Sequence, residues 1–353
     1  MNINYVALSQ KLDAKNNSDV SLLMPKFMGT RDYLSYVKFN FQLISERIKL
    51  YNKYRSNDKL KSIIVLSSIF SLTKRETYSN YHLLLKCKLI LQHSIIENVF
   101  LTLEGHAYEE LVIKETSSIH PKSVVWLRQH SPISLAQTGV INTIKSLEQK
   151  VNILTTGTAY AAFLNNYSSY LNVIVIGTSK SRNINTVLRE GDAVLVAPEG
   201  TEKSTLDFLN FLYTLDSRFD KYEFIFRMHP NLSKNYKIRK QIRKNKSKHN
   251  FHLSNQSLDK DLMETRSTLY RGSAVAIESL AYNNLPIYLN FDGDMNLNVF
   301  SILKSDFPTL KDTSNLSEFF DLMQNEKYSS YGKEIYNKLF EPLSTSLMAK
   351  LFV

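Results

Sequence analysis

Cysteine, glycine and long apolar runs are all scarce in this chain of 353 residues. Its single cysteine, Cys87, excludes an internal disulfide bond and any site built from several thiolates, and its apolar neighbours favour a buried side chain. No segment reaches the roughly 18 consecutive apolar residues of a membrane-spanning helix. The first 14 residues have neither a basic start nor an apolar stretch, so no secretory signal is expected. We therefore expect a reducing, cytoplasmic compartment, with a peripheral position on the inner face of the cytoplasmic membrane as the alternative.

Several motifs of common enzyme classes are absent as well. The sequence has no Gly-x-Gly-x-x-Gly pattern and no Walker phosphate loop, which argues against dinucleotide redox chemistry and against a P-loop kinase. It also has no Gly-x-Ser-x-Gly elbow of the kind that carries a hydrolase nucleophile. These absences leave transfer and binding functions open.

The composition that is present belongs to a globular protein. Hydrophobic residues make up 43% of the chain and aromatic residues 11%, and the length predicts two domains. The net charge of +11 is concentrated in one segment: residues 234–248 hold eight basic side chains and no acidic one, which leaves +3 for the remainder. The basicity is therefore a property of one segment and not of the whole fold.

Apolar spacing predicts alternating strands and helices. A helix is expected from about Asp32 to Tyr54, with one apolar face formed by Leu34, Val37, Phe41, Ile44, Ile48 and Tyr51. Buried strands are expected at Ser62–Ser71, Asn98–Leu103, Ser123–His130, Val151–Leu154, Asn172–Gly177, Ala193–Ala197, Glu223–Met228, Ser267–Tyr270 and Pro286–Leu289. Helices are expected from His106 and over Thr158–Tyr167, Ser204–Leu215 and Ser273–Tyr282.

This alternation predicts an α/β fold with parallel sheets. We expect two Rossmann-like, doubly wound domains that face a cleft, at residues 1–167 and 168–335, and a closing helix at 336–353 that crosses back. In such sheets, ligands bind outside the carboxyl ends of the strands. Polar residues that directly follow a predicted strand are therefore the candidate site residues.

The segment Tyr270–Ala281 combines a strand end, a tight turn and the start of a helix. Gly272 would allow close approach of the backbone, and Ser273 would cap the helix and bond a phosphate oxygen at its amino end. Glu278 lies about one and a half turns further on, in an otherwise small and apolar helix. We expect its carboxylate to reach a ribose hydroxyl, with an ordinary capped helix and a solvated Glu278 as the alternative.

A second segment, Phe224–Pro230, ends a hydrophobic strand in Arg-x-His-Pro. Arg227 and His229 would then lie at the carboxyl edge of the sheet, where Pro230 stops the strand and fixes the turn. A purely structural histidine is the alternative. A third, weaker segment is Glu199-Gly200, which follows the strand Ala193–Ala197 and precedes a helix. Its amides would face a phosphate or an anionic sugar, although helix capping alone also explains it.

The order and spacing of these motifs over about 151–290 resemble the donor domain of GT-B glycosyltransferases. The similarity is to those that use cytidine nucleotides: Kdo transferases of capsule and O-antigen, His-Pro-motif sialyltransferases and CDP-glycerol glycerophosphotransferases. The resemblance implies that His229-Pro230 and Ser273 hold the donor phosphate and that Glu278 contacts the ribose. Asp292-Gly293-Asp294 resembles the metal-binding Asp-x-Asp of the other glycosyltransferase fold but comes after a late strand, the wrong place for that role. No metal and no other cofactor are therefore expected.

In the first half, Glu104-Gly105-His106-Ala107-Tyr108-Glu109 and the later His130-Ser131 resemble a group of bacterial surface-carbohydrate biosynthesis proteins. Glu104, His106 and His130 are the candidate bases that would take a proton from an acceptor hydroxyl. The alternative is that Glu104 caps the next helix and His130 satisfies a turn. Glu109 is expected to pack or to support the site.

The basic segment 234–248 interleaves its charges with Tyr236, Ile238 and Ile242. A solvated helix face is the simplest interpretation, and attraction to an anionic membrane surface or a charged glycolipid is the functional one. Nucleic-acid binding is not expected, because neither a known module nor base-stacking aromatic residues are recognisable.

These observations predict a metal-independent glycosyltransferase of capsule or lipopolysaccharide assembly. Its donor would be a cytidine-type nucleotide sugar resembling CMP-Kdo, and its acceptor a surface glycan or glycolipid. Arg227 would neutralise charge on the leaving nucleotide, and Glu104 would activate the acceptor. The alternatives are a polyol-phosphate transferase that uses CDP-glycerol or CDP-ribitol, and a noncatalytic polysaccharide-assembly protein that retains the fold.

Overall fold

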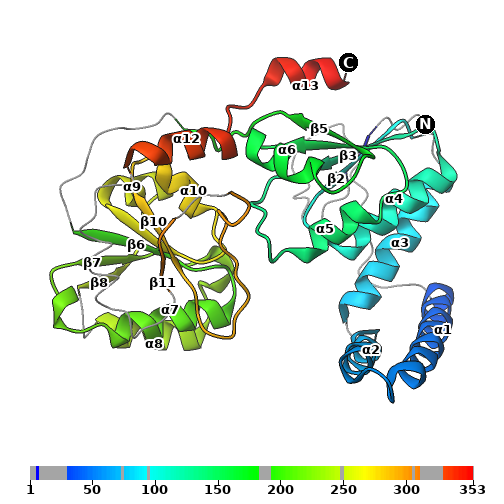
Figure 1. The fold of residues 1–353 in the computed structure, drawn as a ribbon, viewed down its shortest axis with the longest axis horizontal. Helices are drawn as coiled ribbons and strands as arrows, with labels where there is room; N and C mark the ends of the chain where they lie inside the picture. Colours follow the sequence, from blue (N-terminus) through cyan, green and yellow to red (C-terminus); the bar gives the residue numbers. More distant parts are fainter. Residues whose placement is uncertain are drawn as a thin grey trace. The chain divides into compact units, whose positions relative to one another are not determined.

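The structure, a computed structural model, describes residues 5–7, 30–72, 75–93, 96–182, 192–246, 250–303, 307–310 and 329–352. Backbone contacts divide the chain into two compact units. The first comprises residues 1–127 and 146–152, and the second comprises 128–145 and 153–353. Two sheets organise the fold, as Figure 1 shows. No helix within the described ranges is both long and apolar enough to cross a membrane.

The first sheet has five strands in the order β1-β2-β3-β4-β5. They are β1 (Tyr5–Ala7), β2 (Asn98–Thr102), β3 (Val124–Arg128), β4 (Val151–Thr155) and β5 (Leu171–Val175), and β1 is parallel to β2. The helices α4 (Ala107–Ile119), α5 (Thr138–Lys145) and α6 (Thr158–Asn165) connect them. The structure confirms the four strands expected between residues 98 and 177, whereas β1 is an additional strand that the sequence pattern did not predict.

Between residues 30 and 93, the described part of the chain before β2 forms the helices α1 (Thr30–Tyr54), α2 (Lys59–Leu72) and α3 (Arg75–His93). The helix expected from Asp32 is confirmed as α1, but the strand expected at Ser62–Ser71 is wrong, because that run forms α2. Asp58 accepts a hydrogen bond from the backbone N–H of Lys61 at 2.9 Å, which caps the new helix. Once a helix has begun, β-branched residues continue it at little cost.

Cys87 on α3 is buried, as its neighbours in the sequence indicated, and burial raises the pKa of its thiol to about 12. The thiol is therefore protonated at neutral pH, and the side chain acts as a small apolar group in the packing of the helices.

The second sheet has six parallel strands in the order β11-β10-β9-β6-β7-β8. They are β6 (Ala193–Ala197), β7 (Glu223–Phe226), β8 (Phe251–Leu253), β9 (Ser267–Tyr270), β10 (Leu285–Leu289) and β11 (Thr309–Leu310). The helices of this part are α7 (Glu202–Thr214), α8 (Tyr236–Lys246), α9 (Leu258–Glu264) and α10 (Val275–Leu280). This is the doubly wound α/β arrangement that the sequence predicted.

The position of β6 determines where the site lies. All five residues of β6 are buried, because the strand lies between β9 and β7 and its side chains enter a core that includes Phe208, Phe224 and Phe226. The three parallel strands β9, β6 and β7 therefore end side by side. The loops that follow them must share one edge of the sheet.

The end of the chain forms two helices, α12 (Ser329–Leu339) and α13 (Thr345–Phe352). The residues between them are not helical: Pro342 forms an isolated parallel bridge with Thr178, and Ser344 N–H donates to the Ile176 carbonyl. Gly177 allows this approach, since a Cβ at that position would collide with the Pro342 backbone. The terminal segment thus packs against the carboxyl ends of β4 and β5.

Candidate functional site

Three loops meet at the carboxyl edge of the second sheet, and two glycines set their spacing. Gly200, after β6, lies against the imidazole of His229, after β7: a Cβ on residue 200 would come within 3.0 Å of the ring. Gly272, after β9, lies against Glu199, because a Cβ there would be 3.0 Å from the carboxylate Oε2. The loop that follows β6 therefore contacts both of its neighbours, and the sequence-predicted residues of three separate segments form one cluster.

His229 presents a defined hydrogen-bonding group at this edge. Its Nδ1 accepts a hydrogen bond from the Asn231 backbone N–H at 3.3 Å, at the start of a short 3₁₀ turn that Pro230 initiates. In the neutral imidazole this assigns the proton to Nε2, which becomes a donor. The side chain is exposed, so Nε2–H is available to an anionic ligand.

After β9 the predicted turn and helix are present, but the helix begins at Val275 and its N-cap is Ala274 instead of Ser273. Gly272 adopts a φ of +59°, which favours glycine, and the Ser273 hydroxyl accepts a hydrogen bond from the Val275 backbone N–H at 3.3 Å. The helix α10 that follows is short, with six residues. Ser273 thus lies at the same sheet edge as His229, with the Glu199-Gly200 loop between them.

Glu278 is a buried carboxyl group in this part of the chain, with only 6% of its surface exposed. This excludes the alternative of a solvated Glu278. Burial raises the pKa of Glu278, and the positive charges of Lys180, Arg182 and Arg227 oppose that rise. A carboxylate kept in such a place costs stability unless a ligand or a cation compensates it.

The sequence interpretation missed Lys180 and Arg182, although they follow β5 closely. The backbone N–H of Arg182 donates to the Tyr336 hydroxyl at 2.6 Å, and its Nε lies 3.3 Å from Asp259 Oδ1. Tyr282 also donates to that Asp259 oxygen, at 2.7 Å. Nothing in the local sequence linked Lys180 and Arg182 to Glu278. Their position just after Gly177-Thr178, at the end of a predicted strand, was the one feature that could have indicated a role in the site.

Arg227 is held in an ion pair. Its Nη1 lies 2.6 Å from Oδ2 of Asp261, which is fully buried, and it also donates to the carbonyl of Gln256 at 3.1 Å. The charge expected to balance a leaving nucleotide is therefore already balanced by Asp261. Arg227 thereby joins β7 to α9 at the rim of the candidate site.

Asp294 of the Asp-x-Asp segment is also paired. It lies 2.8 Å from both Lys203 Nζ and Arg271 Nη1, and the hydrogen bond from Lys203, ahead of the Arg271 charge, lowers the pKa of its carboxyl. These contacts hold the loop after β10 against α7. Within the described ranges, no group of three or more His, Cys, Asp or Glu side chains is arranged to bind a metal ion.

A separate cluster follows β2 in the first sheet. The carboxylate of Glu104 lies 2.9 Å from His106 Nε2, and both side chains are exposed. Glu109 is fully buried beneath them and accepts hydrogen bonds from the backbone N–H groups of Glu104, Gly105 and His106, and from Thr102 Oγ1. Burial raises the pKa of Glu109, while these donors oppose the rise. Glu109 thus holds the loop that presents Glu104 and His106.

His130 follows β3, the strand next to β2 in the sheet, and is exposed. The neighbouring Gln129 is fully buried: its side-chain oxygen accepts from the Thr156 backbone N–H at 3.0 Å, and its Nε2 donates to the Ser131 carbonyl at 2.6 Å. This fixes the backbone on both sides of His130. The structure therefore brings Glu104 and His106 together and places His130 at the end of an adjacent strand.

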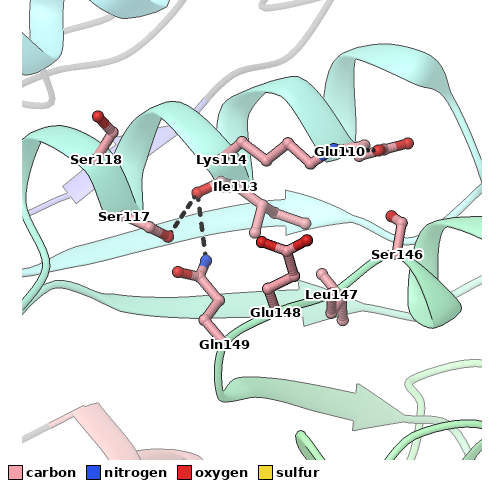
Figure 2. A pocket seen from close by; sticks show the side chains of 9 residues that line it. All are labelled: Glu110, Ile113, Lys114, Ser117, Ser118, Ser146, Leu147, Glu148 and Gln149. Atoms are coloured by element: carbon pink, nitrogen blue, oxygen red, sulfur yellow. Dashed lines mark hydrogen bonds and ion pairs between the residues drawn. The ribbon is translucent and has the colours of Figure 1, made fainter.

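A cavity of about 580 Å³ lies elsewhere, along the carboxyl half of α4 (Figure 2). Ser117 Oγ and Gln149 Nε2 both donate to the Ile113 carbonyl there, and Glu110 pairs with Lys114. The loop 146–149 leads directly into β4, so the cavity lies at the amino end of that strand. This is the edge opposite to the one where doubly wound sheets bind ligands, and we do not assign the site to it.

Comparison with known proteins places the fold. No protein-family model and no curated protein sequence matches the chain. Among solved structures, MnaA from S. aureus, solved with UDP, is similar with a TM-score of 0.54 at 11% identity, over 78% of this chain and 79% of that one. A putative UDP-N-acetylglucosamine 2-epimerase from Listeria monocytogenes is similar with a TM-score of 0.51 at 10% identity, over 78% and 77%.

The chain also matches a variant of S. aureus TarM solved with fondaparinux, α-GlcNAc-glycerol and UDP, with a TM-score of 0.48 at 13% identity. That match covers 76% of this chain, which spans 57% of the length of TarM. Identities this low establish the fold alone. The chain has a GT-B-like α/β fold with parallel strands in two sheets, as the sequence predicted.

Proposed function

We propose that this protein transfers a sugar from a nucleotide donor to a surface-glycan or glycolipid acceptor, and that the donor is of the cytidine type, resembling CMP-Kdo. The observation that carries the proposal is the meeting of three strand-end loops, in which Gly200 lies against His229 and Gly272 against Glu199. In doubly wound sheets, this edge is where nucleotides bind. Similarity of fold to a protein solved with UDP supports a nucleotide ligand.

Within this site, each residue has a distinct role. His229 Nε2–H and the Ser273 hydroxyl donate hydrogen bonds to the donor phosphate. The buried carboxylate of Glu278 accepts hydrogen bonds from the ribose hydroxyls, which compensates for its burial. The glycines at 200 and 272 let the phosphate approach the backbone closely.

Charge on the leaving nucleotide is balanced by protein cations. We assign this role to Lys180 and Arg182, whose positive charges act on the carboxyl group of Glu278. Arg227, whose charge Asp261 already balances, makes a smaller contribution than the sequence suggested. Fixed cations stabilise charge that develops in the transition state, and the reaction so described needs no metal ion.

The acceptor is activated by the pair of Glu104 and His106. Glu104 takes the proton from an acceptor hydroxyl as the oxygen forms a bond to the anomeric carbon, while the bond from that carbon to the donor phosphate breaks and the nucleotide leaves. His106, 2.9 Å away, orients the carboxylate.

Product mass tests the proposal. The purified chain is incubated with CMP-Kdo, with CDP-glycerol or with UDP-N-acetylglucosamine, each with and without a glycolipid acceptor. Transfer of the sugar from CMP-Kdo supports the proposal. Transfer of a polyol phosphate would replace it with another reaction. So would an epimerised nucleotide sugar formed without acceptor, which has the mass of its substrate and is recognised by NMR. Nucleotide binding without turnover on any acceptor would indicate an assembly protein that retains the fold.

A further inference from the structure

The hairpin of α1 and α2 exposes an unusual amount of apolar surface. The side chains of Phe41 and Leu60 are each 69% exposed. Other large apolar side chains of the hairpin are also exposed: Tyr33, Leu34, Ile48, Ile63, Ile64 and Leu66. The two helices pack against each other, and Figure 1 shows them beyond α3, away from the strands of the first sheet. Soluble monomers rarely expose an apolar area this extensive unless it binds something.

On α1 three of the exposed apolar residues form a stripe. Leu34, Phe41 and Ile48 are spaced by seven residues, about two helical turns, so they lie in line on one face. This is the apolar face that the sequence predicted, and such a face normally packs into a core. Tyr36, which lies off the stripe, is buried instead. One edge of the apolar face of α1, formed by Leu34, Phe41 and Ile48, is therefore directed outward, whereas Val37, Ile44 and Tyr51 are half-buried.

On α2 the packing face and the exposed face are distinct. Ser62 and Val65 are buried, and the Ser62 hydroxyl is satisfied by the Lys59 carbonyl at 2.7 Å. Leu60, Ile63 and Ile64 follow the spacing that places side chains on one helix face, and all three are exposed. A second outward apolar face thus lies on the neighbouring helix of the same hairpin.

The charge of the hairpin indicates what covers these faces. Residues 30–72 contain eight Lys and Arg residues but three Asp and Glu residues, a net charge of +5. Lys53, Arg55, Lys59 and Lys61 flank the turn between the helices. A second copy of the chain would bring like charges together, whereas an anionic bilayer offers both negative headgroups and an apolar interior.

The basic segment 234–248, the membrane candidate from the sequence, lacks this combination. On α8, Ile238 and Ile242 are buried in the core of the second sheet, and Lys237 pairs with Glu202 at 2.9 Å. Its charges and Tyr236 remain at the surface, but the two isoleucines between the charges are unavailable to a bilayer, so a single apolar side chain is left exposed there. Basic residues alone give weak attraction, and stable attachment to a surface needs buried apolar area as well.

We propose that the α1–α2 hairpin docks on the surface of an anionic lipid bilayer. Its exposed apolar side chains enter the boundary between headgroups and acyl chains, and the cations around the turn contact the headgroups. The hairpin lies in the interface and does not span the membrane. This docking is independent of the proposed glycosyl transfer, although it would place the chain at the surface that carries a glycolipid acceptor.

Flotation of the full chain with vesicles tests the proposal. We expect binding to vesicles of phosphatidylglycerol and phosphatidylcholine, little binding to phosphatidylcholine alone, and weaker binding as salt rises. Replacing Phe41, Ile63 and Ile64 together by Gln should lower the partition coefficient about tenfold or more, because it removes buried apolar area. Replacing Lys49, Lys53 and Lys59 by Gln should weaken binding and flatten its salt dependence. Replacing Lys240, Lys244 and Lys246 on α8, a matched change of charge, should leave binding unchanged.

A second readout does not depend on the folding of the Gln variants. The chain has one tryptophan, Trp126, which is buried, so a Phe41→Trp variant reports on the hairpin. Its added fluorescence should shift to the blue with anionic vesicles and be quenched by brominated acyl chains. Unchanged fluorescence, or binding that only the α8 variant reduces, would overturn the proposal. A wild-type dimer that the hairpin variants dissociate, without vesicle binding, would overturn it in favour of self-association.

Discussion

Gly200 lies directly against the imidazole ring of His229, so closely that a Cβ on residue 200 would stand 3.0 Å from the ring Cγ and 3.1 Å from Cδ2 and Nδ1. The contact joins the loops that follow β6 and β7. It leaves the ring little freedom on the side of Gly200, while the exposed His229 remains accessible from solvent. The orientation of His229 therefore depends on a residue that has no side chain.

This contact can be tested by a double-mutant cycle. Gly200→Ala should displace the ring and weaken nucleotide binding, and His229→Ala should weaken it about tenfold, by loss of a hydrogen bond to a charged phosphate. In the His229→Ala background, Gly200→Ala should have no further effect, because the ring it would strike is absent. Calorimetric titration of all four proteins measures the coupling. Additive losses would show that Gly200 acts on the ligand without His229.

Glu278 gives a prediction about pH. Burial raises the pKa of Glu278 in the folded chain above its unfolded value. Its contribution to stability is therefore complete below the unfolded pKa and is lost as pH rises through the folded pKa. At neutral pH, Glu278→Gln should leave the free energy of unfolding equal or higher, with less dependence on pH, and should weaken nucleotide binding about tenfold.

Urea denaturation at several pH values and nucleotide titration measure the two effects. Glu334→Gln is the matched control, since Glu334 is exposed and forms a surface ion pair with Lys338 on its own helix. That variant should change neither quantity by more than about 0.5 kcal/mol. A Glu278→Gln variant that binds nucleotide normally would remove the residue from the site.

The pair of Glu104 and His106 should act as one unit. Glu104→Gln keeps the shape of the side chain but cannot take a proton, so turnover should fall roughly 100-fold while donor affinity is retained. Because His106 lies 2.9 Å away, adding His106→Gln to that variant should cost much less than His106→Gln costs alone. Steady-state rates of the single and double variants check this. Near-normal turnover of Glu104→Gln would transfer the role of base to His106 or His130.

Glu109 should prove essential for the loop that carries this pair. It accepts hydrogen bonds from three successive backbone N–H groups, and Gln has one acceptor oxygen where the carboxylate has two. Glu109→Gln should therefore lower the free energy of unfolding by about 1–3 kcal/mol, because buried donors lose their partners. The adjacent Glu110→Gln breaks a surface pair with Lys114 and should cost less than about 1 kcal/mol. Equal losses in the two variants would contradict the role of Glu109.

The sequence predicted four of the six strands of the second sheet, β6, β7, β9 and β10, because each is a short apolar run that ends at a small or polar residue, and it missed the shorter β8 and β11. Their parallel order then determined which residues meet, which is why His229, Ser273 and the Glu199-Gly200 loop appear together. The prediction of a strand at Ser62–Ser71 was wrong because periodicity alone does not distinguish a buried strand from a helix. Its capping residue, Asp58, was the signal that could have decided the matter.

The sequence alone could not predict which charged side chains pair with the candidate site residues. Arg227 looked like a free cation, but its partner Asp261 is 34 residues away along the chain. Lys180 and Arg182 act on Glu278 from a segment almost 100 residues earlier, and Tyr336 binds that segment from nearer the end of the chain. Ion pairs of this kind depend on tertiary structure, and no local pattern in the sequence encodes them.

Hydrogen–deuterium exchange with and without CMP tests the central claim most directly, because it locates the nucleotide in the folded chain. The account predicts slower exchange with saturating CMP in peptides that contain residues 199–201, 227–231 and 271–274, which follow the adjacent strands β6, β7 and β9. Exchange around residues 146–149, beside the cavity of Figure 2, should be unchanged. Protection at 146–149 with none at the three loops would contradict the assignment of the donor site to the carboxyl edge of the second sheet.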